Sequence, residues 1–274
     1  MNPIDPRKAV SSLERERMVS TMLRITDVTR SHILKAVTEG FTVEEKPDGS
    51  LVTPVDMEAE QKARAIISET FPSHGFLGEE FGHTKPEAAV QWVIDPIDGT
   101  ADFTRGVPLY GTVLAAFAGE RPLMGVLDFP GLNLRVWASY GGGFKREGSA
   151  LASSNVRPKP IISLPPLHSI GRFNLSPAFL EAARAKFPDH RSYWTCFSYA
   201  LSSSGALDCS VELFCKIWDV AAAEILATEN GKAVAWLQHP EPWAGGKCSM
   251  AIGDPTIVRE IAALWKEHMT TLPK

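Results

Sequence analysis

Residues 92–100, Trp-Val-Ile-Asp-Pro-Ile-Asp-Gly-Thr, constrain the fold of this chain more than any other stretch. Bulky apolar residues that favour a β-strand are followed there by two aspartates, and Pro96 cannot continue a strand ladder. We therefore predict a buried strand that stops before Asp95 and Asp98. Gly99 permits the tight turn at which both carboxylates would be presented.

Two carboxylates held close together repel each other and need a cation between them. A hard divalent ion that prefers oxygen ligands meets this need, and the carbonyl oxygen of Ile97 offers a neutral third ligand. The N–H groups of Gly99 and Thr100 would lie beside the metal, where the start of a helical turn favours a bound phosphate. The alternative is an ordinary strand exit, because Asp-Pro and Asp-Gly are common turn dipeptides.

A second acidic turn follows a short apolar run at residues 76–80, Phe-Leu-Gly-Glu-Glu. A brief strand ending at Gly78, placed beside the strand of residues 92–94, would bring Glu79 close to the two aspartates. Such an oxygen cage is what a pair of magnesium ions requires. Residues 82–90 are polar and contain proline, so we predict a surface loop there.

Two amphipathic helices are predicted near the start of the chain. Apolar residues recur at three- and four-residue spacing over residues 11–37, as one long helix or two joined ones, and over residues 57–71. Thr53 and Asp56 both suit the N-cap of the second helix. Asp56 can therefore be explained as a simple helix cap, with no role in a site.

Three apolar segments, at residues 110–118, 123–129 and 134–139, are separated by turns that contain glycine and proline. This spacing predicts an antiparallel meander. A stretch rich in serine and proline, residues 149–166, is a candidate hinge between two halves of one catalytic unit. The predicted halves are residues 1–145, with the metal site and a large antiparallel sheet, and residues 146–274.

The second half alternates short apolar segments with a helix at residues 177–186, which predicts a second sheet in a layered α/β (α+β) sandwich. Asp219 precedes an alanine-rich helix predicted over residues 220–229. It suits the N-cap of that helix, and a carboxylate at a helix end can also bind a cation. Glu212 ends a strand predicted from residue 207, where it is either a substrate contact or an exposed charge.

Three motifs in this order, Gly78-Glu79-Glu80, residues 92–100 and Trp218-Asp219-Val220-Ala221-Ala222, resemble those of the inositol monophosphatase family of magnesium-dependent, lithium-sensitive phosphatases. The resemblance spans nearly the whole chain. It implies a layered fold of the inositol-monophosphatase and fructose-bisphosphatase kind. It also implies a homodimer and inhibition by Li⁺.

The resemblance assigns roles to individual residues. The ligands of two or three Mg²⁺ ions would be Glu79, Asp95, the Ile97 carbonyl, Asp98 and Asp219, with Asp56 in support. Glu79 and Thr100 would hold and deprotonate the attacking water, Asp98 would complete the catalytic set, and Gly99 and Thr100 would bind phosphate oxygens. Glu212 and Asp219 would contact the substrate, Lys46 would lie near the metals, and residues 191–199 would shape the same pocket.

The predicted activity is Mg²⁺-dependent hydrolysis of a small-molecule phosphate monoester, with L-histidinol phosphate or myo-inositol monophosphate as the substrate. One alternative is a 3′(2′),5′-bisphosphate nucleotidase, although no expanded basic pocket is evident for a second phosphate. Another is a regulatory binding protein with the same fold and no turnover. All the acidic ligands are present, so nothing in the sequence favours lost activity.

Composition excludes other classes of protein. The 28 Lys and Arg against 32 Asp and Glu give a net charge of −4, which provides no basic field for nucleic acid or an anionic membrane. No stretch approaches the ~18 apolar residues of a membrane span. The four cysteines form no Cys-x-x-Cys pair, and no signal-peptide pattern is evident, so we predict reduced thiols in a cytoplasmic protein.

Overall fold

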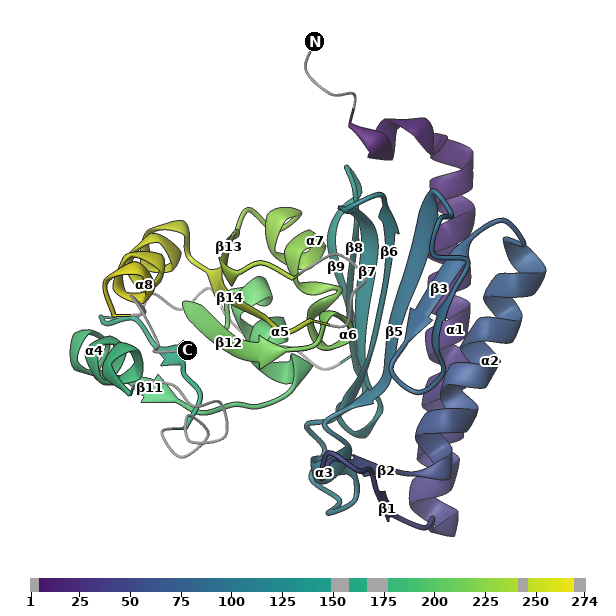
Figure 1. Ribbon diagram of the computed structural model, residues 1–274, viewed down its shortest axis with the longest axis horizontal. Helices are drawn as coiled ribbons and strands as arrows, with labels where there is room; N and C mark the ends of the chain where they lie inside the picture. Colours follow the sequence, from purple (N-terminus) through teal and green to yellow (C-terminus); the bar gives the residue numbers. More distant parts are fainter. Residues whose placement is uncertain (1–4, 149–157, 167–176, 241–245, 269–274) are drawn as a thin grey trace.

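The computed structural model describes residues 5–148, 158–166, 177–240 and 246–268, and it contains two large sheets, each with its own helices. In Figure 1 the two sheets lie side by side, with the long helices α1 and α2 at one end of the molecule and α4 and α8 at the other. Of the hinge predicted at residues 149–166, residues 149–157 lie outside the described residues.

Two long helices cover the outer face of the first sheet. Helix α1 (Ser12–Glu39) is a single helix, capped by the Ser11 hydroxyl, which accepts from the backbone N–H of Glu14 at 3.1 Å. Its residues Met18, Met22 and Ile25 are fully buried against the sheet. Helix α2 (Pro54–Thr70) packs beside it and begins three residues earlier than the sequence predicts, because Pro54 suits the first helical position.

The first sheet has seven strands in the order β4-β3-β5-β6-β7-β8-β9. Its strands are β3 (Gly75–Gly78), β4 (Gly82–Thr84), β5 (Val90–Asp98), β6 (Gly111–Ala118), β7 (Arg121–Phe129), β8 (Leu134–Ser139) and β9 (Gly143–Gly148). Strands β3 and β5 pair in parallel, and every other pair in this sheet is antiparallel. The predicted meander corresponds to β6, β7 and β8.

The polar edge strand β4 contradicts the prediction of a loop throughout residues 82–90. It pairs with β3 through its backbone, and its sequence, Gly-His-Thr, carries no apolar signal that could reveal it. A two-stranded sheet, β1 (Glu44–Glu45) with β2 (Leu51–Val52), lies before α2, and short helices η1 (Pro6–Ala9) and η2 (Pro130–Leu132) complete this part.

Strand β5 does not stop before Asp95, as the sequence predicts, but continues through Pro96 to Asp98. Asp95 lies opposite Val113 and Asp98 opposite Gly111, with a register shift between the two pairs. A bulge of this kind leaves a residue unpaired, so a proline, which lacks an N–H donor, is tolerated inside the strand. The bulge lets one strand present both carboxylates.

The second sheet has five strands in the order β11-β10-β12-β14-β13. These are β10 (Ile162–Ser163), β11 (His190–Arg191), β12 (Cys209–Cys215), β13 (Ala233–Gln238) and β14 (Cys248–Gly253). The helices of this part are α4 (Ala178–Lys186), α5 (Cys196–Ser204), α6 (Ile217–Val220), α7 (Ala223–Thr228) and α8 (Pro255–His268), while the short α3 (Thr100–Phe103) follows β5.

A continuous hydrophobic core joins the two sheets. It contains Val113 and Leu127 of the first sheet, Tyr199 of α5, Leu226 of α7 and Ile252 of the second sheet. Helices α5, α6 and α7 therefore lie between the sheets, and α4 and α8 cover the far face of the second sheet (Figure 1). This layered α/β sandwich is the predicted fold class. Among the described residues, no helix combines the length and the apolar character needed to cross a bilayer.

The helix predicted over residues 220–229 with Asp219 as its N-cap is wrong in detail. Helix α6 begins after Lys216, which occupies the N-cap, and it ends at Val220 before α7 begins. Asp219 is the third residue of α6, and its Oδ2 accepts from the backbone N–H of Lys216 at 2.7 Å. Asp56 is likewise not the N-cap of α2, because Thr53 occupies that position.

Candidate active site

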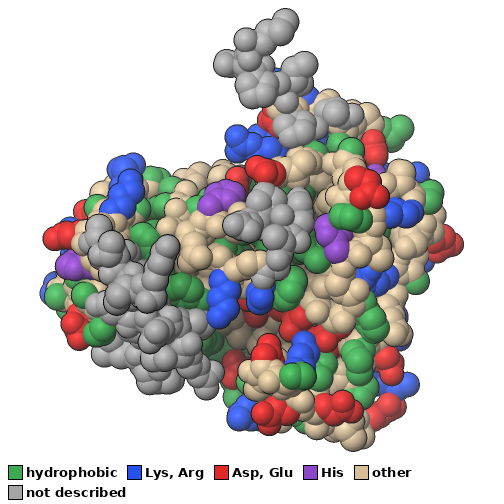
Figure 2. Space-filling view, viewed as in Figure 1, with side chains coloured by type: hydrophobic (Ala, Val, Ile, Leu, Met, Phe, Trp, Pro, Cys, Tyr) green, Lys and Arg blue, Asp and Glu red, His purple; other side chains and the backbone are tan. Residues whose placement is uncertain are grey.

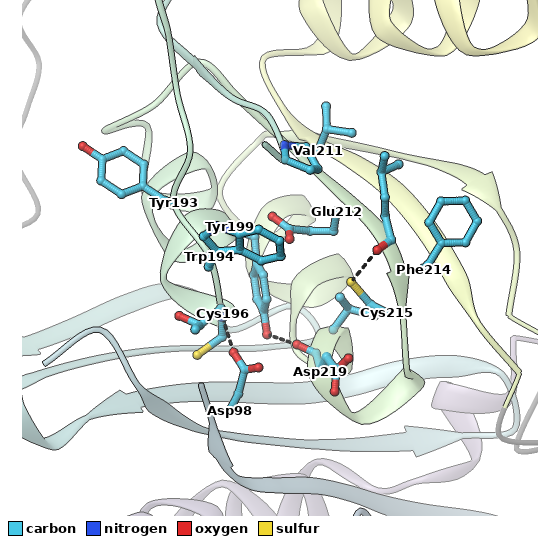
Figure 3. Close-up of a pocket in the computed structure, with 14 residues that line it drawn as sticks. Asp98, Tyr193, Trp194, Cys196, Tyr199, Val211, Glu212, Phe214, Cys215 and Asp219 are labelled. Carbon is cyan, nitrogen blue, oxygen red and sulfur yellow. Dashed lines mark hydrogen bonds between the residues drawn. The ribbon is translucent and has the colours of Figure 1, made fainter. Parts of the chain in front are cut away.

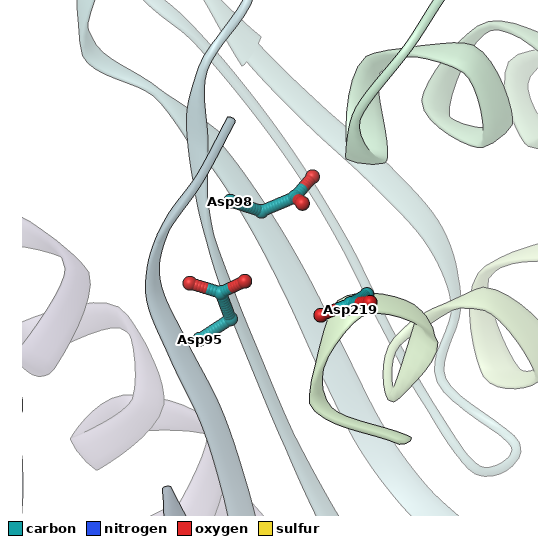
Figure 4. A group of neighbouring side chains, drawn as sticks. All are labelled: Asp95, Asp98 and Asp219. Carbon is teal, nitrogen blue, oxygen red and sulfur yellow. The ribbon is translucent and has the colours of Figure 1, made fainter. Parts of the chain in front are cut away.

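Three aspartates from both parts of the molecule converge at one point. One carboxylate oxygen from each of Asp95 and Asp98 on β5 and Asp219 on α6 lies within 4.8 Å of the other two (Figure 4). Each carboxylate accepts a hydrogen bond from a backbone N–H group. Ile97 donates to Asp95 at 3.0 Å, Cys196 donates to Asp98, and Lys216 donates to Asp219. The cluster is therefore held in place by the backbone of three different segments.

Burial raises the pKa of each of these carboxyl groups. The pKa of Asp98 is raised to about 7, chiefly by burial and also by the charge of Glu79, against the opposing hydrogen bond from Cys196. Burial and the neighbouring carboxylates raise the pKa values of Asp95 and Asp219 well above the ordinary value. The ionised cluster is thus unfavourable by itself and would be stabilised by a cation.

Glu79 lies beside the three aspartates but outside their tightest grouping. It follows β3, and its backbone N–H donates to the Ile94 carbonyl of β5 at 3.3 Å. Lys46 Nζ donates to Glu79 Oε1 and to Glu80 Oε1, at 2.9 Å each. Burial lowers the pKa of Lys46, but these two bonds outweigh it and raise that pKa overall, so the lysine stays charged.

Glu60 fixes the turn that carries Glu79, a role that the sequence does not reveal. Its side chain on α2 is fully buried, and its carboxylate accepts from the backbone N–H groups of Glu80 at 2.8 Å and Phe81 at 3.2 Å. Arg64 Nε donates to the same carboxylate at 2.8 Å. The only signal for such a role is an acidic residue on the buried face of an amphipathic helix.

Asp56 and Thr100 link helix α2 to the end of β5. Asp56 Oδ2 accepts from the backbone N–H of Thr53 at 2.8 Å, which completes the capping box of α2. Its other oxygen, Oδ1, accepts from the Thr100 hydroxyl at 3.3 Å, and this hydroxyl lies 3.0 Å from the Ile97 carbonyl oxygen. Asp56 is therefore both a cap partner and a neighbour of the site, and burial raises its pKa.

Gly99 makes the turn between β5 and α3 possible. Its φ of +91° is left-handed, and a Cβ at this position would lie 2.5 Å from Cγ2 of Thr195. Thr100 is the first residue of α3, so its N–H group has no partner within the helix.

A cavity of about 230 Å³ opens beside Asp98 and Asp219. Figure 2 shows acidic side chains gathered in a hollow between the two parts of the molecule. The described residues that line the cavity are Asp98, Pro165, Tyr193, Trp194, Thr195, Cys196, Tyr199, Val211, Glu212, Leu213, Phe214, Cys215, Asp219 and Val220 (Figure 3). Much of the predicted stretch of residues 191–199 thus forms one wall of the cavity.

Glu212 lies on β12 inside this cavity, and its Oε1 accepts from the Ser198 hydroxyl of α5. Burial raises the pKa of Glu212 to about 7. Cys196 contacts Asp98 through its backbone N–H, a contact that a sequence pattern cannot reveal because any residue type could supply it.

Comparison with known proteins agrees with this geometry. The profile of the inositol monophosphatase family matches residues 15–270. The histidinol-phosphatase of Mycobacterium tuberculosis is 34% identical over 200 residues, covering 69% of this chain and 75% of the relative. The bifunctional phosphatase IMPL2, chloroplastic, of Arabidopsis thaliana is 29% identical over 253 residues, covering 88% of this chain and 71% of the relative.

The fold is shared with solved structures. The extragenic suppressor protein suhB from Bartonella henselae superposes with a TM-score of 0.78 over 92% of this chain and 99% of that one, at 20% identity. An identity this low supports the fold alone, whereas the family profile covers nearly the entire sequence. The chain therefore belongs to the inositol monophosphatase family.

Proposed function

We propose that this chain is a metal-dependent phosphomonoesterase that hydrolyses a small-molecule phosphate ester to an alcohol and inorganic phosphate. The observation that carries the proposal is the convergence of Asp95, Asp98 and Asp219, from two parts of the chain, within 4.8 Å of one another. Membership of the inositol monophosphatase family, and relatives named as phosphatases, support the same activity.

The residues present fit Mg²⁺. Their donor atoms are hard carboxylate and carbonyl oxygens, and a bound cation would offset the clustered negative charge that, with burial, raises the pKa values of the aspartates. We assign the ligands of two or three ions to Glu79, Asp95, the Ile97 carbonyl, Asp98 and Asp219, with Asp56 in support. Bound there, Mg²⁺ would neutralise phosphate charge and increase the acidity of a coordinated water. Competition by Li⁺ is expected by resemblance to the family.

The side chains around the cluster would hold the attacking water and the phosphate. We propose that Glu79 and Thr100 together hold and deprotonate the water. The Thr100 hydroxyl lies 3.3 Å from Asp56 Oδ1 and 3.0 Å from the Ile97 carbonyl oxygen, which supports its place beside the cluster. The N–H groups of Gly99 and Thr100 would donate to phosphate oxygens. Burial raises the pKa of the nearby Cys196 thiol well above its ordinary value, so it is a poor nucleophile and we propose direct attack by water.

The proposed substrate is L-histidinol phosphate or myo-inositol monophosphate, whose amine or hydroxyl groups Glu212 and Asp219 would contact. The described residues that line the cavity include no Lys, Arg or His. This favours a monoester over a 3′(2′),5′-bisphosphate, because a second phosphate needs positive partners. A homodimer, a cytoplasmic location and a division of the chain into two halves are further proposals, which rest on the family resemblance and on sequence composition. Strand β9 continues the first sheet to Gly148, three residues past the predicted boundary at residue 145.

Phosphate release from L-histidinol phosphate, myo-inositol 1-phosphate and adenosine 3′,5′-bisphosphate tests the function, measured with Mg²⁺ and with a chelator. We expect turnover of one monoester with Mg²⁺ and none with the chelator. Undiminished turnover in chelator would contradict the proposed metal site, and the absence of turnover on every ester would favour a binding protein.

A further inference from the structure

One wall of the cavity carries a large aromatic side chain that is not buried. Trp194 is 49% exposed, whereas Tyr199 on the same wall is 1% exposed. Both residues line the cavity that contains Glu212. In Figure 3 the indole of Trp194 and the carboxylate of Glu212 both project into this space, whereas the ring of Tyr193 points away from it.

The backbone on both sides of Trp194 is fixed by hydrogen bonds. On one side, the backbone N–H of Tyr193 donates to Ser163 Oγ at 3.1 Å, and this hydroxyl lies 3.3 Å from the Tyr193 carbonyl oxygen. On the other side, the Thr195 hydroxyl donates to the Leu109 carbonyl at 2.6 Å. Thr195 also has a left-handed φ of +67°, which is costly for a β-branched residue. The loop is therefore held so that the indole is presented at the cavity and not folded into the core.

The cavity is acidic where it meets this indole. Its charged lining residues within the described part of the chain are Asp98, Glu212 and Asp219. Asp98 and Asp219, with Asp95 behind them, form the end of the site at which we place metal and phosphate. At the other end, Glu212 Oε1 accepts from Ser198, and no described residue donates a hydrogen bond to its Oε2. An aromatic face beside a carboxylate with a free acceptor atom is suited to an organic cation.

We propose that Trp194 contacts the substrate and selects phosphate monoesters whose organic end carries a protonated amine or a protonated nitrogen heterocycle. The indole face would hold the cation by a cation–π interaction, and Glu212 would supply the compensating negative charge. This proposal rests on the proposed phosphomonoesterase function and adds the class of ester that it acts on.

Steady-state kinetics of the wild type, Trp194→Ala and Trp194→Phe test the proposal on a cationic ester, L-histidinol phosphate, and on a neutral polyol ester, myo-inositol 1-phosphate. Trp194→Ala should raise KM for the cationic ester about tenfold, within the range of a desolvated cation–π contact, and leave its kcat within about twofold. KM for the polyol ester should change less than about twofold. Trp194→Phe, which keeps an aromatic face, should restore most of the lost affinity.

An equal rise of KM on both esters, or none on the cationic ester, would overturn the proposal. If the wild type hydrolyses neither ester, the proposed phosphatase function fails, and calorimetric binding of L-histidinol, which has no phosphate, then tests the role of Trp194 separately. Wild-type binding that Trp194→Ala weakens at least fivefold would support the role of Trp194. No binding by the wild type, or equal binding by both proteins, would overturn that role. Exposed Leu13 on α1 supplies a control variant, Leu13→Ala, that should match the wild type throughout.

Discussion

Asp56 in the first part of the molecule and Asp219 in the second occupy the same position in their helices and reach the site by the same device. Each is the third residue of its helix, and one oxygen of each accepts from the backbone N–H of the N-cap residue, at 2.8 Å for Asp56 and 2.7 Å for Asp219. The difference lies in the neighbours of each carboxylate. The other oxygen of Asp56 accepts from the Thr100 hydroxyl, whereas the Asp219 carboxylate lies in a group with those of Asp95 and Asp98. A helix start can therefore orient a carboxylate towards a site, and the groups that it then meets differ: a hydroxyl for Asp56 and two further carboxylates for Asp219.

The largest expected effect is on turnover when the cluster loses a charge. Asp98→Asn or Asp219→Asn should lower kcat with Mg²⁺ by about a thousandfold, because each removes a carboxylate from the proposed cation cage. Phosphate release from the best monoester of the substrate panel measures this effect. A variant that keeps the wild-type rate would show that the cluster is not the catalytic centre.

Asp56→Asn should have a smaller effect, about tenfold to a hundredfold, as is usual for a residue that supports metal ligands. The asparagine oxygen can still accept from Thr53, so the helix cap and the unfolding midpoint should be nearly preserved. The same assay, with the unfolding midpoint as a control, separates the two roles. A loss as large as that of Asp219→Asn would mean that Asp56 is a full ligand and that the contrast between the two residues is false.

Glu212→Ala should change the preference among substrates and leave hydrolysis of a generic aryl phosphate within about threefold. Glu212 lies in the cavity beyond the aspartates, so its removal affects the organic end of the ester and not the phosphate. We would measure kcat/KM on L-histidinol phosphate, myo-inositol 1-phosphate and an aryl phosphate. Equal losses on all three esters would argue against a recognition role.

The free energy of unfolding of the metal-free chain should fall as the pH rises from about 4 to 7, because of the buried aspartates of the cluster. The pKa of Asp98 is about 7 in the folded chain, above the ~3.9 of an unfolded aspartate, so folding favours its protonated form. Stability from this group is therefore complete below about pH 4 and decreases as the pH rises towards 7. Thermal unfolding in chelator should show a falling midpoint over this window, and Asp98→Asn should flatten the slope. Saturating Mg²⁺ should restore the midpoint near pH 7, and no response to Mg²⁺ would contradict a metal site.

The sequence predicts the parts of the site that are marked by local patterns. The strand and its two aspartates, the acidic turn at Glu79 and the Trp218-Asp219 motif were all recognisable, and the family profile and the layered fold confirm the resemblance built on them. The continuation of β5 through Pro96 was not predicted, because a proline normally ends a ladder and only a bulge accommodates it.

Other features could not be predicted because they depend on contacts between distant segments. Two examples are the hydrogen bond from the backbone N–H of Cys196 to Asp98 and the hydrogen bond from the backbone N–H of Glu80 to the Glu60 carboxylate. The exposed Trp194 belongs to the same class, because its position depends on hydrogen bonds to Ser163 and Leu109 on both sides of the residue.

Calorimetric titration of the chelator-treated protein with Mg²⁺ and Mn²⁺ measures directly whether the two parts of the molecule build one metal site. We expect Asp219→Asn, which alters only the second part of the chain, to weaken binding at least tenfold relative to the wild type, and Asp56→Asn to weaken it less. Unchanged affinity and stoichiometry in Asp219→Asn would contradict the claim that the two parts of the molecule build one shared metal site.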